Sequence, residues 1–404
     1  MKCKTVIILL MFMNLFFAQT AIKQDSVFAK KIKIFNTNYK EFEVIENIVY
    51  AVTNSNYLIV FDLKQDKIIK VKREVISVAK NNKQEIVFLN RHNQIIRYKN
   101  GKVKQINIVC EPYKLMLDRK NNPIVISDKG LIYDNKIFEP LNVKYKSVFY
   151  GVKSIDDKKR VFMNPDLIFL DSKNRLWLTY DRGEFGEDIL FFDLEKREFY
   201  KDDYLSIYID YQKTNENQDR YFQDLYKTFP DKIKVMEKDT LYKFPNQLPI
   251  YNPIRGIVEK DGNFFISQSL IHFFIDSYFC LIYDFDNENF YKSLNLTNSF
   301  LEIKDPKGFA MVNEFLGPLH LNKFNNSVYY YSDKGFFKII EDEGKYNKEF
   351  IFKPWITWSA TNRNNLGADI NVTKFEFISE NELVFLTTNN GIGYYNGTEV
   401  KYFQ

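Results

Sequence analysis

The sequence has few of the residue types and motifs that identify a chemistry. It contains three histidines and three cysteines in 404 residues. Zinc patterns of the Cys-x-x-Cys or His-Glu-x-x-His type do not occur, and the glycine-rich phosphate-binding and Gly-x-Ser-x-Gly patterns are missing too. Calcium remains an alternative at Asp284–Glu288, although this segment lacks the glycine and the final glutamate of a calcium loop. We expect neither a metal ion nor another cofactor.

Net charge is small as well. The chain has 57 basic and 52 acidic residues, with a formal net charge of +5. A nucleic-acid-binding protein concentrates its basic residues on one face, whereas here the two signs are mixed along the chain. We therefore expect no nucleic-acid partner.

Long apolar runs are missing except at the N-terminus. Residues 5–17 are apolar apart from Asn14, with basic residues before them and small residues after them. This is the layout of a secretory signal, and the run is shorter than the about 20 residues that span a membrane. We predict a signal peptide at 1–20, a mature chain at 21–404 without a membrane span, and a periplasmic or secreted location in a bacterium. The alternative is a buried N-terminal strand or helix.

Only Cys110 and Cys280 follow the predicted signal peptide. An oxidising compartment would permit a disulfide between them. However, Cys280 lies in the apolar run Tyr278–Tyr283, where cysteine usually packs as a small hydrophobic residue. We expect two free cysteines, with a bridge as the alternative.

Aromatic residues are abundant and arranged in repeats. Tyrosine and phenylalanine number 27 and 38, which favours strands. One hairpin pattern recurs as FDLKQDKIIK (61–70), FDLEKREFYK (192–201) and YDFDNENFYK (283–292), and looser copies occur elsewhere. Another strand–turn–strand unit precedes each hairpin, and its first strands are Ile48–Thr53, Ile86–Asn90, Ile124–Ser127, Leu176–Thr179, Phe264–Ser267, Val328–Ser332 and Leu383–Thr387. Four strands in each of seven units predict an all-β fold, a single seven-bladed β-propeller of four-stranded antiparallel blades, with six or eight blades as alternatives.

One segment interrupts the repeat, at about 202–250. Within it, Asp219–Thr228 has apolar residues at helical spacing, so we predict a partly helical insertion. Insertions in repeat proteins often form binding loops, and a packed lid is the alternative here.

A family resemblance appears at these repeats. Asp171–Thr179 (DSKNRLWLT), together with the Gly-hydrophobic-aromatic segments at Gly130, Gly335 and Gly391, resembles the two-component regulator propeller repeat. That repeat occurs in extracytoplasmic sensor regions of bacterial hybrid histidine kinases, so the resemblance implies a propeller with a sensor-like role, here without a kinase part. Similarity to a sialidase Asp-box is poorer, because Asp171–Thr179 lacks the Gly and the Ser/Thr-x-Asp opening.

The predicted innermost strands suggest a binding site. Alternation places Lys114, Leu167, Arg255, Pro318 and Lys374 at equivalent positions, opposite an apolar face. Equivalent positions in a ring form one layer at one end of the channel, where clustered cations would attract an anionic ligand. We predict ligand-binding roles for Lys114, Arg255 and Lys374. The alternative is a hydrated channel mouth in which nearby acids balance these cations.

Three further residues are candidate ligand contacts. His320 lies on a predicted innermost strand, while Trp355 and Trp358 could stack on a sugar or a partner. Core packing is the alternative for the two tryptophans. We expect a monomeric, exported, non-catalytic module that binds an anionic small molecule, a glycan or an acidic protein surface. A carbohydrate-active enzyme, either a glycan lyase or a hydrolase using the channel face, is the competing class, and no residue is assigned a catalytic role.

Overall fold

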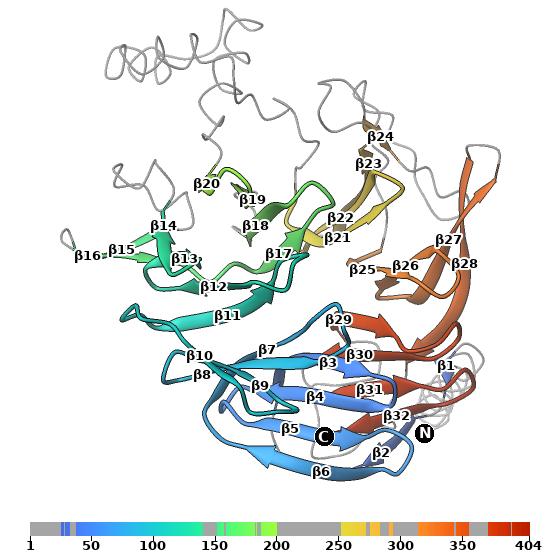
Figure 1. Cartoon of the computed structure of the whole chain (residues 1–404). Coiled ribbons are helices and arrows are strands. Elements are labelled where there is room, and N and C mark those ends of the chain that lie inside the picture. Colours follow the sequence, from blue (N-terminus) through green and yellow to red (C-terminus); the bar gives the residue numbers. More distant parts are fainter. Residues whose placement is uncertain are drawn as a thin grey trace, which may run out of the picture.

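The computed structural model describes a defined part of the chain. The described residues are 26–27, 29–32, 38–139, 152–156, 159–181, 183, 187–199, 252–271, 275–282, 291–293, 314–342, 345–354, 371–388 and 390–404. The predicted signal peptide, the insertion with its predicted helix, the acidic segment at 284–288, Trp355 and Trp358 lie outside these residues. All regular elements within them are β-strands (Figure 1).

Seven sheets, each containing four consecutive antiparallel strands, lie around a ring, which confirms the predicted seven-bladed propeller (Figure 1). Blades 1 to 3 consist of β3 (Tyr39–Ile45), β4 (Ile48–Thr53), β5 (Leu58–Asp62) and β6 (Lys67–Lys72); β7 (Val75–Lys80), β8 (Ile86–Asn90), β9 (Gln94–Arg97) and β10 (Val103–Gln105); and β11 (Pro112–Leu117), β12 (Pro123–Ser127), β13 (Gly130–Tyr133) and β14 (Lys136–Phe138). A two-stranded hairpin, β15 (Val152–Asp156) and β16 (Lys159–Phe162), follows blade 3.

The remaining four blades continue in the same strand order. They are β17 (Leu167–Leu170), β18 (Arg175–Asp181), β19 (Glu187–Asp193) and β20 (Glu198–Phe199); β21 (Ile254–Lys260), β22 (Asn263–Ile271), β23 (Ile275–Ile282) and β24 (Tyr291–Ser293); β25 (Leu316–Asn322), β26 (Ser327–Ser332), β27 (Gly335–Asp342) and β28 (Lys345–Pro354); and β29 (Val372–Phe377), β30 (Leu383–Thr387), β31 (Ile392–Tyr395) and β32 (Val400–Phe403). The first strand of each blade is the innermost, since these strands contact one another between several neighbouring blades.

Two short N-terminal strands extend the last blades. β1 (Ser26–Val27) pairs in parallel with β28, and β2 (Ala29–Ile32) pairs in parallel with β32. Blades 6 and 7 therefore have five strands each, and the segment leading into blade 1 is hydrogen-bonded to the outer edge of blade 7.

Acidic side chains explain the repeated turns. In the hairpin at 61–70, Asp62 Oδ1 accepts the backbone N–H groups of Lys64 and Gln65 at 2.8 and 2.9 Å. Asp193 makes the same two bonds in blade 4. An aspartate that caps the backbone two and three residues later favours a tight turn between strands. In these two hairpins, the repeated Asp therefore marks where the chain turns.

The Asp171 segment, which carries the family resemblance, ties a turn to the core. Asp171 is fully buried and accepts bonds from Arg175 Nε at 2.7 Å and Trp177 Nε1 at 3.1 Å. It also accepts the backbone N–H groups of Lys173 and Arg175. Because a buried carboxylate is stable only when its oxygens accept hydrogen bonds, Asp171 requires donors such as Arg175 and Trp177 beside it.

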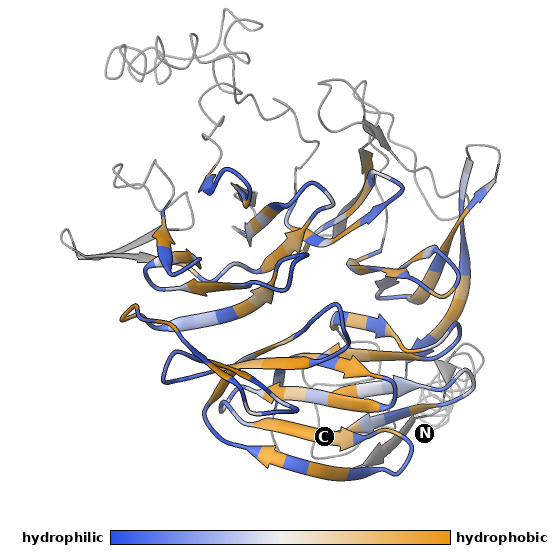
Figure 2. Ribbon diagram, viewed as in Figure 1, coloured by the Kyte–Doolittle hydropathy of each residue, from blue (hydrophilic) through white to orange (hydrophobic). Residues whose placement is uncertain are grey.

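Seven apolar clusters hold the ring together, one between each pair of neighbouring blades. Most strands are rich in hydrophobic residues, and most turns are hydrophilic (Figure 2). The cluster between blades 7 and 1 includes Phe61 stacked on Phe403 with ring centroids 4.8 Å apart. Burial of apolar surface at this junction closes the ring without a covalent link.

Cys110 is half-buried and Cys280 is buried, and both are free, as expected. The alternative of a Cys110–Cys280 disulfide is wrong. Among the described residues, no helix is both long and apolar enough to cross a membrane.

Candidate functional site

A β-bulge determines which side chains the innermost strands present at equivalent positions. It interrupts the pairing of β3, β7, β11, β21, β25 and β29 with their neighbours, but β17 pairs without a shift. In β11 and β29 the first paired residue after the bulge is Lys114 or Lys374. In β21 that residue is Gly256, and Arg255 is the extra residue of the bulge. The predicted alignment is therefore right for Lys114 and Lys374 and wrong for Arg255.

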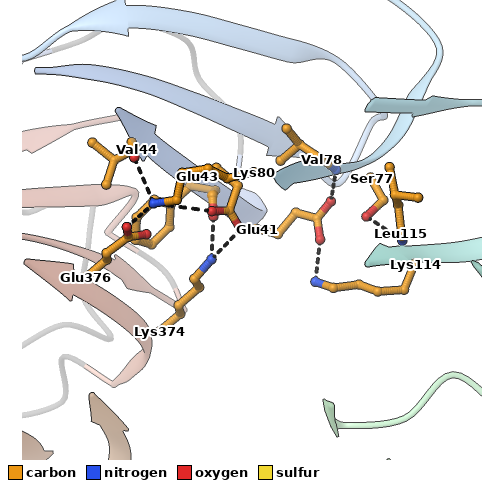
Figure 3. A network of polar contacts seen from close by, with 11 residues as sticks. Glu41, Glu43, Val44, Ser77, Val78, Lys80, Lys114, Leu115, Lys374 and Glu376 are labelled. Atoms are coloured by element: carbon orange, nitrogen blue, oxygen red, sulfur yellow. Dashed lines mark hydrogen bonds and ion pairs between the residues drawn. The ribbon is translucent and has the colours of Figure 1, made fainter. Parts of the chain in front are cut away.

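Lys374 binds blade 1 from blade 7. Its Nζ donates to Glu43 Oε1 at 2.9 Å and to the carbonyl oxygen of Phe42 at 2.6 Å (Figure 3). Burial lowers the pKa of Lys374, but the charges of Glu43 and Glu376 outweigh it, so the pKa is raised overall. The ammonium group therefore stays charged at neutral pH.

Two more lysines converge on blade 1 from the other side. Lys114 of blade 3 forms an ion pair with Glu41 (Figure 3). Lys80 of blade 2 donates to the carbonyl oxygen of Val44 at 3.0 Å, forms an ion pair with Glu376 of blade 7, and lies 3.9 Å from Glu43. The side chains thus link blades 7, 1, 2 and 3 on the inner side of the ring.

We call Glu41, Glu43, Lys80, Lys114, Lys374 and Glu376 the inner ion-pair cluster. Three lysines and three glutamates give it a formal charge of zero. Its acids are less accessible than two of its bases: the side chains of Glu41 and Glu43 are 6% and 18% exposed, whereas those of Lys114 and Lys374 are 36% and 39% exposed. Lys114 and Lys374 are thus more exposed than the acids with which they pair, whereas the side chains of Lys80 and Glu376 are 14% and 12% exposed.

The sequence-based expectation of an uncompensated cationic cluster needs correction. Lys114, Arg255 and Lys374 each have a carboxylate partner, as in the alternative of balancing acids. Sequence reasoning missed Glu41, Glu43 and Lys80. The alternation of Glu41 and Glu43 in strand β3 was the available signal, because it puts two acids on one face of an innermost strand.

Arg255 belongs to a different contact. Its Nη1 lies 2.8 Å from Asp181 Oδ2 in blade 4, and its Nε donates to the carbonyl oxygen of Ser269 at 3.0 Å. The guanidinium carbon also lies 5.7 Å from the centroid of the Phe315 ring. Arg255 thus joins blades 4 and 5, and it makes no ion pair with the inner ion-pair cluster.

His320 of blade 6 packs against blade 7. Its ring centroid is 5.6 Å from that of Phe375 and 6.1 Å from that of Phe377. Burial, followed by the charges of Lys374 and Lys80, lowers the pKa of His320 to about 3. The imidazole is therefore neutral at physiological pH and would be a poor proton donor.

Glu41 has a second contact that explains its burial. Its Oε1 accepts the backbone N–H of Val78 at 2.7 Å, and Ser77 Oγ accepts that of Leu115 at 2.9 Å one blade further on. Glu41 in β3 and Ser77 in β7, at equivalent positions of their strands, thus each accept a hydrogen bond from the next blade. Glu41 is both the counterion of Lys114 and a structural acceptor.

A pocket of about 310 Å³ lies between blades 5 and 6, and residues lining it include Lys260, Phe265, Val328, Glu341 and Tyr346. None of the sequence-predicted site residues lines this pocket. Within the described part of the chain, no group of three or more His, Cys, Asp or Glu side chains is arranged to hold a metal ion.

Comparison with known proteins finds fold-level likeness only. No protein-family model matches the chain. No curated protein matches its sequence significantly. Among solved structures, the extracellular domain of a putative hybrid two-component system from B. thetaiotaomicron aligns with TM-score 0.45 and 11% identity, over 92% of this chain and 40% of that one. A second such domain from the same organism aligns with TM-score 0.36 and 10% identity, over 90% and 46%.

The Cps50 (Swd1) β-propeller domain from Myceliophteria thermophila gives TM-score 0.43 and 8% identity, over 90% of this chain and 98% of that one. The chain spans less than half the length of the two-component chains with which it aligns. Similarity at this level does not transfer a function, so the class of protein that the structure defines is a seven-bladed β-propeller.

Proposed function

We propose that the protein is an exported, sensor-like binding module, and that the inner ion-pair cluster recognises an anionic group of its ligand. The observation that carries the proposal is the asymmetry of exposure between the half-buried lysines and their more deeply buried acids. The exported location rests on the charged, apolar and small-residue pattern of residues 1–21.

The donor capacity of the lysines supports this proposal. An ammonium group has three N–H donors. Lys374 uses two of them on Glu43 and Phe42, and Lys114 uses one on Glu41. Within the described residues, Lys374 thus retains one donor and Lys114 retains two. A carboxylate, phosphate or sulfate oxygen could accept these bonds without displacing Glu41 or Glu43.

A binding experiment tests this function. Isothermal titration with trigalacturonate, citrate and phosphate, and with neutral galactotriose as a control, should show binding of at least one anion and none of the neutral sugar. Binding should weaken with salt, because the screening length falls to about 8 Å at physiological ionic strength. Replacing Lys114 or Lys374 by Gln should cost about 1–3 kcal/mol of binding free energy.

Lys401→Gln is the matched control, because its ion pair with Asp66 joins strand β32 to the turn between β5 and β6, away from the cluster. If Lys401→Gln weakens binding as much as the two cluster variants, or if the neutral sugar binds equally well, the assignment of the cluster is wrong.

The competing enzyme function receives less support from these residues. The cluster carboxylates all contact lysines, and His320 is neutral at physiological pH, whereas glycoside cleavage requires a protonated acid beside the scissile bond. Turnover of a glycan panel that is abolished by Glu41→Gln, with folding retained, would reverse this preference.

A further inference from the structure

Strand β6, at the outer edge of blade 1, carries exposed apolar side chains. It is the outermost strand of blade 1 in the described sheet, and its sequence is KIIKVK. Three branched apolar residues lie on it in the open: Ile68 is 37% exposed, Ile69 is 50% exposed and Val71 is 43% exposed. Such a strand presents unpaired backbone groups and apolar surface together.

The register gives the strand two chemically different faces. Ile68 and Val71 pair with Phe61 and Ile59, which belong to the apolar cluster between blades 1 and 7. The lysines face blade 2 instead: Lys70 Nζ lies 5.2 Å from the Tyr98 ring centroid, and Lys72 Nζ lies 4.3 Å from that of Phe88. One face is therefore apolar and the other basic.

The lysines of β6 differ from those of the inner ion-pair cluster in having no counterion among the residues that the structure describes. No described carboxylate forms an ion pair with Lys67, Lys70 or Lys72. Burial and the neighbouring charge of Lys70 both lower the pKa of Lys72, which shows that like charges crowd one another here. A negatively charged group at this edge would relieve that repulsion.

Other outer edges of the same ring accept an added strand. β1 pairs in parallel with β28 at the edge of blade 6, and β2 pairs in parallel with β32 at the edge of blade 7. β6 is the corresponding outer strand of blade 1. Blade geometry at this rim is therefore compatible with a fifth strand.

We propose that β6 is a docking strand for an extended segment of a partner protein, in which acidic residues alternate with apolar ones. Successive residues of an added strand point to opposite faces, so its acids would meet Lys70 and Lys72 while its apolar residues extend the face of Ile68 and Val71. A second copy of β6 would instead bring lysine against lysine. This surface is separate from the inner ion-pair cluster and does not depend on the function proposed for that cluster.

The test uses the full chain and a fluorescein-labelled peptide of alternating glutamate and valine, followed by fluorescence anisotropy. We expect saturable binding that weakens with salt and is lost when alternate peptide nitrogens of the probe are methylated. Lys70→Glu should weaken binding about fivefold or more, the upper range of a reversed cross-strand charge pair. Lys136→Glu, on the exposed outer strand β14 of blade 3, is the matched control and should leave binding unchanged.

Several results would overturn the docking strand. They are equal binding of a lysine–valine peptide, equal binding of the methylated peptide, and full binding by Lys70→Glu. Binding to phosphatidylglycerol vesicles without binding to the peptide would assign the surface to a membrane instead. A dimer in sedimentation that Lys70→Glu dissociates would assign it to a second copy of this chain.

Discussion

Glu41 should be the residue of the inner ion-pair cluster whose loss destabilises the ring most. Its side chain is 6% exposed and makes two kinds of contact, with the Val78 backbone N–H at 2.7 Å and with the Lys114 ammonium group. Glu41→Ala would leave the buried N–H of Val78 without an acceptor and Lys114 without its counterion. Val78 is 3% exposed, so water cannot readily replace the lost acceptor.

The magnitude follows from these two losses. An unsatisfied buried N–H costs about 1–3 kcal/mol. Breaking a fully buried ion pair costs about 3–5 kcal/mol, but Lys114 is 36% exposed and can rehydrate, so this contribution is near the lower end or below it. We expect Glu41→Ala to lower the free energy of unfolding by about 3 kcal/mol.

Two variants separate the contributions. Glu41→Gln keeps an acceptor for Val78 and loses the charge, so it should cost about 1 kcal/mol. Ser77→Ala removes only the neutral bond to the Leu115 N–H, and it should cost about 1–2 kcal/mol. Urea denaturation followed by the fluorescence of buried Trp177 measures all three, and urea leaves the ion pairs unscreened.

If Glu41→Ala costs no more than Ser77→Ala, the ion pair contributes nothing to stability and the expected value of about 3 kcal/mol, roughly the sum of both losses, is wrong. If Glu41→Gln costs as much as Glu41→Ala, the charge rather than the acceptor for Val78 explains the whole effect, and the structural role of the Val78 bond is wrong.

Two other predictions concern stability. Because the pKa of His320 is lowered, this residue takes up a proton near pH 6.5 in the unfolded chain but only near pH 3 in the folded chain. The free energy of unfolding should therefore have its full value above pH 6.5 and decrease as the pH falls toward 3. His320 should contribute at most about 1.4 kcal/mol per pH unit to the slope of the free energy of unfolding against pH. His320→Gln should remove it in urea denaturation across that pH range, and an unchanged slope would contradict the shift. Gly256 packs against the backbone of blade 6, where an added Cβ would overlap the nitrogen of Leu319 and lie 3.0 Å from Pro318 Cα. Gly256→Ala should therefore destabilise the protein by about 1–3 kcal/mol, and an unchanged melting temperature by circular dichroism would show that the blades can separate.

Much of the fold could be predicted from the chain because its signals are local. The strands predicted at Ile48–Thr53, Ile86–Asn90 and Leu383–Thr387 coincide with β4, β8 and β30. Turn aspartates bond to backbone groups two and three residues away, so the pattern that makes a hairpin is contained within ten residues of sequence. Repetition of that pattern then predicted the number of blades.

The site was less accessible to sequence reasoning, because the number of paired residues between the bulge and the following turn differs among the innermost strands. Lys114–Leu117 and Lys374–Phe377 follow the bulge in β11 and β29, whereas the longer run Gly256–Lys260 follows it in β21. Alignment on the turn therefore put Arg255 in the place of Gly256, while Arg255 in fact contacts Asp181. Period-two alternation assumes unbroken pairing, and one inserted residue exchanges the two faces of a strand.

What the sequence by itself determined is the blade: its strands, its aspartate-closed turns and its sevenfold repetition all arise from contacts between near neighbours. Only the tertiary structure decided that Lys374 meets Glu43, a partner 331 positions away, and that Lys80 meets Glu376, 296 positions away. Closing the ring brings the first and last blades together, and the burial of apolar surface that drives this closure is non-directional. The pairing of these charges therefore follows from where ring closure places them, and neither partner carries a local sign of the other.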